Sequence, residues 1–587
     1  MLKLLTRFRI KELILMAISI VFIVLQVGLD LRLPEHMSNI TVLVQTPNSS
    51  MYDILMEGAG MLLCVTCSLI TSIIVGYLAS HIGAGFSKNL REEMFDKVYS
   101  FGMEEIKKFS ISSLITRTTN DINHVQRMVS MGLQIGIKAP IMAVWAVSKI
   151  IDKNLVLSGL TGIAVLIAVL TMFVTMLIVI PKFKLVQKLT DRINCVSRES
   201  LLGIRVIRAY NAEEFQEEKF DDVNTELTRL GKFTGKTMTV IWPLIDLVNY
   251  GLTLGIYIIG AILIQRAMLN IKLELFSNII VFSNYASQVL ASFMMLAMTI
   301  IMYPRVSVSS KRLLEVLNTK STIIDGNFDG KNTAVRGKIE FNHVSFKYPD
   351  SDNYVLKNIS FVANPGETVA IVGSTGCGKS TLIHLIPRFY DVTSGKITID
   401  NIDIKDYTKE GLNSKIGYVP QKAVLMSNTV SENVGYGNKY GKVPSQEQIE
   451  KAIEIAQARS FVMQMSEGYE SQIARGGANV SGGQMQRLQI ARAVARNPEI
   501  YIFDDSFSAL DYKTDAILRK ELQQHTNDST KIIVAQRIGT IRYADKIVVL
   551  NNGKIEGCDI HNNLLDNCPL YRSMAEAQLR KEELYNA

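Results

Sequence analysis

The sequence predicts a chain of two parts, an α-helical polytopic membrane domain followed by an α/β domain with a largely parallel sheet. Six long apolar runs occupy the first half of the 587 residues. From about residue 336 the pattern changes to short apolar strands that alternate with helical stretches, which is typical of helices packed on a parallel sheet. One of these strands ends in a glycine-rich turn.

Each of the six apolar runs exceeds the roughly 20 residues that a helix needs to cross the hydrocarbon core of a bilayer. The shortest separation is at about residue 154, where only Asp152-Lys153-Asn154 divides two runs. We therefore expect six transmembrane helices within residues 1–318. The runs lie near residues 13–34, 54–82, 131–153, 155–181, 237–265 and 274–303.

The positions of lysine and arginine predict the orientation of these helices. Basic residues cluster before the first run, after the second and after the fourth, whereas residues 33–53 contain none. Because basic loops stay on the cytoplasmic side, both termini are expected in the cytoplasm. The first run is too long for a secretion signal and lacks a small-residue cleavage site, so we expect it to be retained. Asp30 and Arg32 predict a salt bridge at the outer mouth.

Charge and cysteine content exclude some other classes of protein. The net charge of +8 follows the membrane topology and forms no basic patch, which argues against nucleic-acid binding. The six cysteines show no metal-ligand spacing. Cys64 and Cys67 have the spacing of a redox pair but lie within an apolar run, where small packing residues are the expectation. We expect cysteine thiols on the cytoplasmic face to be reduced.

The second half contains the strands of the α/β domain, which we expect over residues 336–587 after a polar linker at 319–335. A helix should continue from the sixth run through Arg312–Val316 before this linker. Gly326, Asn327 and Gly330 predict turns in the linker. The predicted strands are Lys338–Phe341, Glu367–Val372, Ile416–Val419, Ile500–Phe503 and Lys531–Val534.

The glycine-rich turn Gly373-Ser-Thr-Gly-Cys-Gly-Lys-Ser380 joins the second of these strands to a helix that begins near Lys379. Backbone N–H groups in such a turn, together with the helix N-terminus, face a bound polyphosphate. Lys379 would reach the terminal phosphates, and the Ser380 hydroxyl would be a ligand of the Mg²⁺ that bridges them. Strand, spacing, lysine and serine all agree, so the sequence predicts a nucleoside triphosphate site.

Two aspartates follow the strand Ile500–Phe503. Asp504 would hold the Mg²⁺ through its carboxylate. Asp505 stands where a general base for the attacking water is expected, within roughly 2.6–3.2 Å of that water. Aspartate is one methylene shorter than glutamate, so its carboxylate oxygens lie farther from the attacking water than those of a glutamate would. Poor hydrolysis is therefore predicted.

A second helix start, Val480-Ser-Gly-Gly-Gln484, precedes a long helical stretch. Its serine and glycines form an anion-binding N-terminus that the first phosphate loop does not need, so it should serve another nucleotide. Its position between the phosphate loop and Asp504 favours this function over a simple helix cap. Tyr348 is a plausible platform for stacking an adenine ring.

Together these residues resemble the ATP-binding cassette exporters that fuse six membrane helices to one cassette. The resemblance covers nearly the whole chain. It implies a dimer that holds two ATP molecules with Mg²⁺, each between one cassette's Walker A loop and the other's signature. It also identifies Phe109–Arg117 and Gly203–Tyr210 as cytoplasmic coupling segments. The implied nucleotide ligands are the Walker A residues Gly373, Ser374, Thr375, Gly376, Cys377, Gly378, Lys379, Ser380 and Thr381, the Q-loop Gln421, the signature Val480, Ser481, Gly482, Gly483 and Gln484, and the D-loop Asp511, with Ser380, Gln421 and Asp504 at the metal.

The sequence departs from this family's pattern in ways that suggest a subtype. Asp505 stands where glutamate is usual, and Gln536 stands where the switch histidine is usual. Glutamine can donate a hydrogen bond but cannot gain a positive charge, so it would stabilise the transition state less. Ala474–Gly477 replaces an acidic stretch. The resemblance therefore implies the degenerate half of a heterodimeric, multidrug-type exporter in a bacterial cell membrane, with a partner that carries the intact glutamate and histidine.

The transported molecule is open at this point. Asp246 lies in the fifth run near Trp242, Asn249 and Tyr250, and a carboxylate at membrane depth needs a watery cavity or a partner. Asp246 and Asn249 are thus candidate substrate residues, unless the helix extends into cytoplasmic water there. Three functions are possible: export of drug-like amphiphiles, export of a lipid or peptide, and ATP-dependent regulation without transport. A cysteine-peptidase domain would favour peptide export, and Met1–Arg9 leaves no room for one.

Overall fold

The computed structural model describes residues 4, 6–46, 49–151, 153–266, 268, 272–331, 333–437, 444–580 and 584, without the side chains of 301, 302 and 305. The chain divides into two compact units. The helical unit consists of Met1–Tyr99 and Ile111–Thr319, and the α/β unit consists of Ser100–Ser110 and Lys320–Ala587.

The helical unit confirms the six predicted spans. Among the described residues, six helical segments are long and apolar enough to cross a membrane. The break near residue 154 is confirmed as well, because the Asn154 side chain accepts hydrogen bonds from the first backbone N–H groups of a new helix, those of Val156 and Leu157. The helices are α2 Ile10–Gln45, α3 Met51–Ser100, α5 Ile111–Thr116, α6 Ile122–Met131, α7 Lys138–Ile151, α8 Leu155–Leu202, α9 Ile204–Ala209, α10 Glu213–Arg266 and α11 Lys272–Asn318, with π-helical turns at Arg117–Asp121 and Gly132–Gly136.

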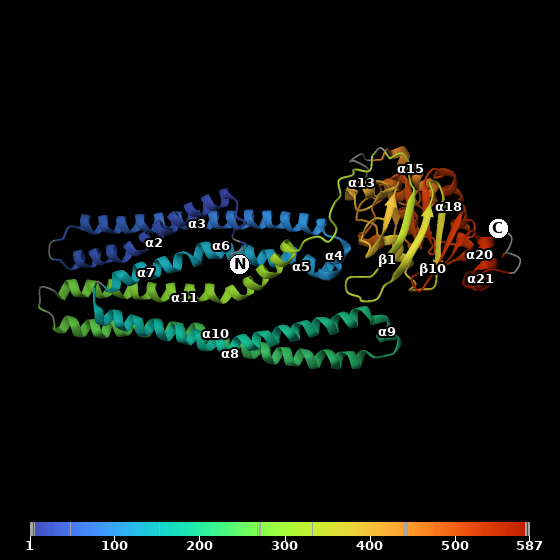
Figure 1. The fold of residues 1–587 in the computed structure, drawn as a ribbon. Coiled ribbons are helices and arrows are strands. Elements are labelled where there is room, and N and C mark those ends of the chain that lie inside the picture. Colours follow the sequence, from blue (N-terminus) through green and yellow to red (C-terminus); the bar gives the residue numbers. More distant parts are fainter. Residues whose placement is uncertain are drawn as a thin grey trace. The chain divides into compact units, whose positions relative to one another are not determined.

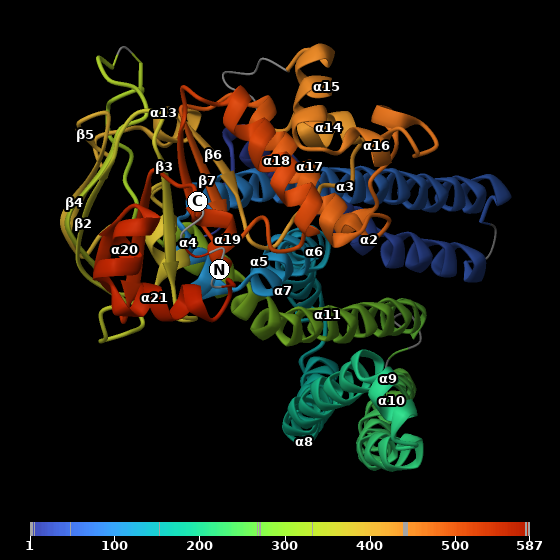
Figure 2. The ribbon, with the colours of Figure 1, turned by 90° about the vertical axis from the view of Figure 1, so that its right-hand side faces the viewer.

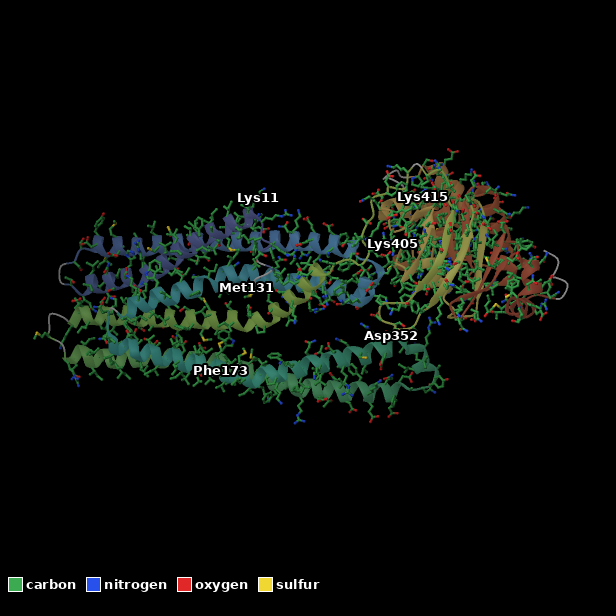
Figure 3. All side chains as sticks on the ribbon, in the orientation of Figure 1. Lys11, Met131, Phe173, Asp352, Lys405 and Lys415 are labelled. Carbon is green, nitrogen blue, oxygen red and sulfur yellow. The ribbon has the colours of Figure 1, made fainter. Side chains whose placement is uncertain are left out.

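The long helices pack side by side around a small apolar core. Figure 1 shows α8 and α10 running along one another, and α11 lies against α2, α7 and α10. Tyr285 and Phe282 of α11 are buried in this core with Val27 of α2 and Ile256 of α10. Many other apolar side chains, such as that of Phe173 on α8, project from the helix surface (Figure 3). Such exposure is typical of helices that are surrounded by lipid or by a partner.

The predicted salt bridge between Asp30 and Arg32 is wrong. The Asp30 carboxylate instead accepts a hydrogen bond from Lys138 Nζ of α7 at 3.0 Å, and another from the Ser68 hydroxyl of α3. Residues two apart on a helix point in different directions, so Asp30 and Arg32 cannot face each other. Packing of three helices decides the partner of this carboxylate.

The first expected coupling segment is divided between the two units. Ser100–Ser110, which includes helix α4 (Met103–Phe109), packs with the α/β unit, whereas Ile111–Arg117 belongs to the helical unit. The buried Glu105 carboxylate anchors α4, since it accepts hydrogen bonds from the backbone N–H groups of Gly102 and Thr322. The expected segment Phe109–Arg117 spans the boundary between the two units, and its coupling role stays a prediction. The second expected segment, Gly203–Tyr210, contains α9 and stays a prediction.

The α/β unit contains two sheets. The larger sheet has the order β10-β9-β3-β8-β7-β6, and its inner strands are parallel. The smaller sheet, β2-β1-β4-β5, is antiparallel. The strands are β1 Ile339–Phe346, β2 Leu356–Ala363, β3 Thr368–Gly373, β4 Ser394–Ile399, β5 Ile402–Asp403, β6 Ile416–Val419, β7 Ile500–Asp504, β8 Thr530–Val534, β9 Lys546–Asn551 and β10 Lys554–Asp559.

Four of the five predicted strands, β3, β6, β7 and β8, lie together in the parallel sheet as expected. The fifth, at Lys338–Phe341, became β1 of the antiparallel sheet. Buried and partly exposed residues alternate along β1, whereas every residue of β7 and β8 is buried. Alternation marks a strand with one covered face, which is typical of antiparallel sheets.

The helices of the α/β unit gather around two apolar cores. Figure 2 shows α14 to α17 grouped together, away from the antiparallel sheet. One core joins these helices to the parallel sheet, and the other lies between the two sheets. The helices are α12 Lys379–His384, α13 Lys409–Ser414, α14 Val430–Val434, α15 Gln446–Ile455, α16 Arg459–Val462, α17 Gly482–Ala495, α18 Tyr512–His525, α19 Ile538–Ile541, α20 His561–Asn567 and α21 Pro569–Glu576.

Candidate nucleotide site

The glycine-rich turn lies between β3 and α12, as the sequence predicts. Gly376 and Gly378 have φ angles of +82° and +105°, which L side chains rarely adopt. A Cβ on Gly373 would collide with the Leu550 carbonyl oxygen of β9. Ser374, Thr375 and Gly376 form the exposed crest of the turn, while Cys377 is buried beneath it. The turn is therefore built from backbone that only glycine permits at three positions.

Lys379 and Ser380 occupy the first turn of α12. The Lys379 ammonium donates to the carbonyl oxygens of Gly373 and Ser374, each at 2.8 Å, so it lies across its own loop. The Ser380 hydroxyl donates to Asp504 Oδ1 at 3.2 Å. Asp504 ends β7 and is only 4 % exposed, and this burial raises the pKa of its carboxyl group. A nearby cation would restore the charged form of this carboxylate.

These residues fit a Mg²⁺ ion. The Ser380 hydroxyl and the Asp504 carboxylate are hard oxygen donors already within hydrogen-bond distance of each other, and Gln421 adds an amide oxygen to the same region. In the described part of the chain no cluster of three His, Cys, Asp or Glu residues could hold a metal. A Mg²⁺ site of this kind commonly has few protein ligands and is completed by phosphate and water. When bound, the ion would neutralise charge on the phosphates.

Asp505 and Gln536 interact with each other. Asp505 Oδ2 accepts a hydrogen bond from Gln536 Nε2 at 3.1 Å and another from Gln421 Nε2 at 3.3 Å. Asp505 has a φ of +47°, an uncommon conformation for a residue other than glycine. Burial raises the pKa of its carboxyl group, although the Gln421 hydrogen bond and nearby Lys379 and Arg537 act in the opposite direction. The three residues that the sequence marks out thus form one cluster, and the two unusual ones share a bond.

Tyr348 lies beside the glycine-rich turn. Its hydroxyl is 3.0 Å from Thr381 Oγ1 of α12, and its ring packs edge-on against Phe346 and Tyr390. The Lys107 ammonium of α4 lies 5.2 Å from the centre of the ring. An aromatic ring fixed in this way can stack on a planar base.

The second helix start is capped by its own side chains, those of Ser481 and Gln484. Ser481 is the N-cap of α17: its hydroxyl accepts from Gln484 N–H at 3.3 Å, and Gln484 Oε1 accepts from Ser481 N–H at 2.8 Å. Val480 is buried, whereas a Cβ on Gly482 would meet open space. Within the described residues no hydrogen bond joins Val480–Gln484 to Gly373–Thr381. That the two elements serve two different nucleotides stays a prediction.

Asp511 of the predicted D-loop is the N-cap of α18, where its carboxylate accepts from Thr514 N–H at 3.0 Å. This hydrogen bond lowers the pKa of the Asp511 carboxyl group. The D-loop also lies close to the signature, because a Cβ on Gly483 would be 3.2 Å from the Ala509 carbonyl oxygen.

The sequence analysis missed two glutamines of α17. Gln486 and Gln489 are buried, and their side-chain amides donate to the Pro420 and Val424 carbonyl oxygens on either side of Gln421. They fix the backbone of the Q-loop. Polar residues on the buried face of a helix are the signal that could have identified them.

The candidate substrate residues lie on α10 of the helical unit. Asp246 is exposed, as are Trp242 and Tyr250 four residues before and after it, so the three share one helix face. The Asn249 side-chain oxygen is buried and has no hydrogen-bond partner among the residues that the structure describes.

Comparison with known proteins agrees with both units. A family model of the ABC transporter transmembrane region matches residues 16–293, and the ABC transporter model matches residues 356–508. A bacterial Atm1-family ABC exporter solved with ATP bound has a similar fold, with a TM-score of 0.76 and 23% identity over 96% of this chain and 99% of that one.

Curated relatives cover most of the chain. It is 38% identical to an uncharacterized ABC transporter ATP-binding protein of Mycobacterium tuberculosis over 89% of this chain and 88% of the relative. It is 33% identical to the uncharacterized ABC transporter ATP-binding protein YfiB of Bacillus subtilis, covering 89% and 90%. An ATP-dependent lipid A-core flippase of Aromatoleum aromaticum is 29% identical, covering 86% and 82%. With six membrane-spanning helices, a cassette bearing the phosphate loop and these relatives, this chain belongs to the ABC transporter family.

Proposed function

We propose that this chain is one subunit of a heterodimeric ABC exporter in a bacterial cell membrane, with both termini in the cytoplasm. Its own Walker site binds Mg·ATP and hydrolyses it little. Its signature, Val480–Gln484, completes the site of a homologous partner that carries the catalytic glutamate and the switch histidine. Transport would then be driven mainly by ATP hydrolysis at the partner's Walker site.

The observation that carries this proposal is the bonding of Asp505. A general base needs a carboxylate oxygen that is free to accept a proton from water. Asp505 Oδ2 accepts from two amides, those of Gln421 and Gln536, and because the side chain is one methylene shorter than the usual glutamate, its other oxygen also falls short of the attacking water. Neither amide can take up the proton or provide a full positive charge. The cluster is suited to holding loops around a nucleotide rather than to activating water.

A heterodimer follows from the need for at least one competent site. Two copies of this chain would place Asp505 and Gln536 in both sites. The intact glycine-rich turn supports nucleotide binding in this chain's own site. The intact capping box of Ser481 supports a role of the signature in the partner's site.

The test separates binding from hydrolysis. The full chain, purified and reconstituted in lipid nanodiscs, should bind Mg·ATP but hydrolyse it barely above background. Lys379→Ala should abolish the binding, because the ammonium that reaches the terminal phosphates is removed. Robust turnover by the chain alone, lost in Lys379→Ala, would refute the heterodimer.

The favoured substrates are drug-like amphiphiles that contact the α10 face around Asp246. An exposed carboxylate flanked by Trp242 and Tyr250 cannot face lipid without cost, and the partnerless oxygen of Asn249 adds a polar group nearby. A cavity between two subunits would accommodate both the Asp246 carboxylate and the Asn249 side-chain oxygen.

Export of a lipid is the second candidate, and the 29% identical lipid A-core flippase supports it. Peptide export uses the same frame, and an ATP-binding regulatory subunit is a third possibility. Proteoliposomes that contain both subunits distinguish these functions. ATP-dependent uptake of a dye supports the amphiphile, movement of a labelled lipid between leaflets supports the lipid, uptake of a labelled peptide supports the peptide, and the absence of all three movements supports regulation.

A further inference from the structure

The loop that carries Gln536 is held by a side chain from the C-terminal end of the α/β unit. Gln578 Oε1 accepts a hydrogen bond from Ile538 N–H at 2.8 Å, and Gln578 Nε2 donates to the Gln536 carbonyl oxygen at 3.1 Å. One side-chain amide therefore binds the backbone on both sides of Arg537.

The two hydrogen bonds of the Gln578 amide have the arrangement that a neighbouring parallel β-strand would provide. In a parallel sheet, one residue binds the C=O of the residue before its neighbour and the N–H of the residue after it. The Gln578 amide takes that place opposite Arg537, whose φ of −92° and ψ of 119° are extended. It also supplies a cap to α19, since Arg537 makes no side-chain capping bond at the start of that helix.

The extended conformation directs two side chains. Gln536 reaches Asp505 Oδ2 at 3.1 Å, and Arg537 Nη2 donates to the Ser508 carbonyl oxygen of the D-loop at 3.4 Å. If the backbone between residues 536 and 538 changed its direction, both contacts would be lost. Both contacts therefore depend on the backbone conformation that the Gln578 amide stabilises.

Gln578 itself has a firm support. Its N–H donates to the carbonyl oxygen of the fully buried Ala575 at 3.1 Å. Tyr571, one turn earlier on α21, is also fully buried, and its hydroxyl lies 2.6 Å from His561 Nδ1 of α20. The amide is exposed, but the segment that carries it is anchored in the core.

We propose that Gln578 is a positioning residue for the loop Gln536–Ile538, called the switch loop because Gln536 stands at the switch position. Through Gln578, the C-terminal segment sets how long this chain's site retains Mg·ATP. The second part rests on the proposed function, in which Gln536 and Asp505 face the nucleotide. The first part concerns the protein without nucleotide and stands alone.

Hydrogen exchange and nucleotide release test the two parts in the full chain in nanodiscs. Without nucleotide, Gln578→Ala should speed exchange of the Ile538 amide roughly 3- to 10-fold, because one hydrogen bond is lost. Release of a fluorescent Mg·ATP analogue should be about threefold faster, with the melting temperature unchanged. Gln578→Glu keeps the acceptor for Ile538 N–H but loses the donor to Gln536. It should leave Ile538 protected and still release the nucleotide faster.

The control is Glu576→Ala, an exposed change on the same segment, which should alter none of these values. Unchanged exchange at Ile538 in Gln578→Ala would overturn the positioning role. Faster exchange with unchanged nucleotide release would overturn its influence on the site. A drop in melting temperature shared by Gln578→Ala and Glu576→Ala would reduce Gln578 to a stabilising residue. If the unmodified chain bound no Mg·ATP, the proposed function would fail, and the exchange measurement would still decide the positioning role.

Discussion

The two glycine-rich helix starts of the α/β unit satisfy their backbone in opposite ways. At α12 the N-cap is Gly378, which offers no side-chain capping bond, and Lys379 lies across the carbonyl oxygens of the turn. At α17 the N-cap is Ser481, which forms a closed capping box with Gln484. The first start leaves N–H groups open for a ligand of its own chain. The second is already stable, so it can present its glycines to another chain without rearranging.

Breaking the second start should have the largest effect. Ser481→Arg, in this chain co-expressed with its partner, should reduce ATP hydrolysis by the pair at least about 100-fold, since a bulky cation would occupy the helix N-terminus where the partner's γ-phosphate docks. Asp505→Asn should cost little by comparison. The measurement is phosphate release by the reconstituted pair, and equal losses from both changes would mean that both sites hydrolyse ATP.

A gain of hydrolysis at the first start would sharpen the comparison. Asp505→Glu together with Gln536→His should raise hydrolysis by the isolated chain about 10-fold or more, because a longer carboxylate and an imidazole replace the bonded pair. Each single change should give much less, since Asp505 and Gln536 share a hydrogen bond and act as one unit. A double variant as inactive as the natural chain would place the defect elsewhere in the site.

Matched alanine substitutions compare the two starts directly. Gly378→Ala should destabilise the α/β unit by about 1–2 kcal/mol, because φ is +105° there and the added Cβ would lie 2.9 Å from Leu356 Cδ2. It should also weaken ATP binding by this chain. Gly482→Ala meets open space and should keep both stability and ATP binding. Thermal melting and nucleotide titration check this pair, and similar losses from both would contradict the difference between the starts.

The smallest effect is expected in the helical unit, where neither helix start is touched. Asp246→Asn keeps shape and hydrogen bonding but removes the charge, so export of a cationic dye should fall several-fold more than export of a matched neutral dye. Basal ATP hydrolysis by the pair should persist. Transport of the two dyes into vesicles provides the measurement, and an unchanged ratio would mean that Asp246 does not contact the substrate.

The six spans, the glycine-rich turn and the strand that ends at Asp504 could be predicted from the sequence because their causes are local. A run of apolar residues is long enough to cross a bilayer or it is not, and the turn needs glycine wherever φ is positive. Asp505 and Gln536 were identified differently: they lie at or just beyond the ends of two buried strands, and they depart from the residues that the family resemblance leads one to expect there. The residue types in these positions leave few alternatives.

Only the tertiary structure decided which distant side chains meet. The bond between Asp505 and Gln536, the pairing of Asp30 with Lys138 and the hold of Gln578 on the switch loop each join residues 31 to 108 positions apart. Such pairs depend on the direction and register of packed elements, which no local pattern records. The same reason explains why β1 joined an antiparallel sheet and why Ser100–Ser110 packs within the α/β unit: burial of whole faces, rather than the preference of any one segment, selects the arrangement.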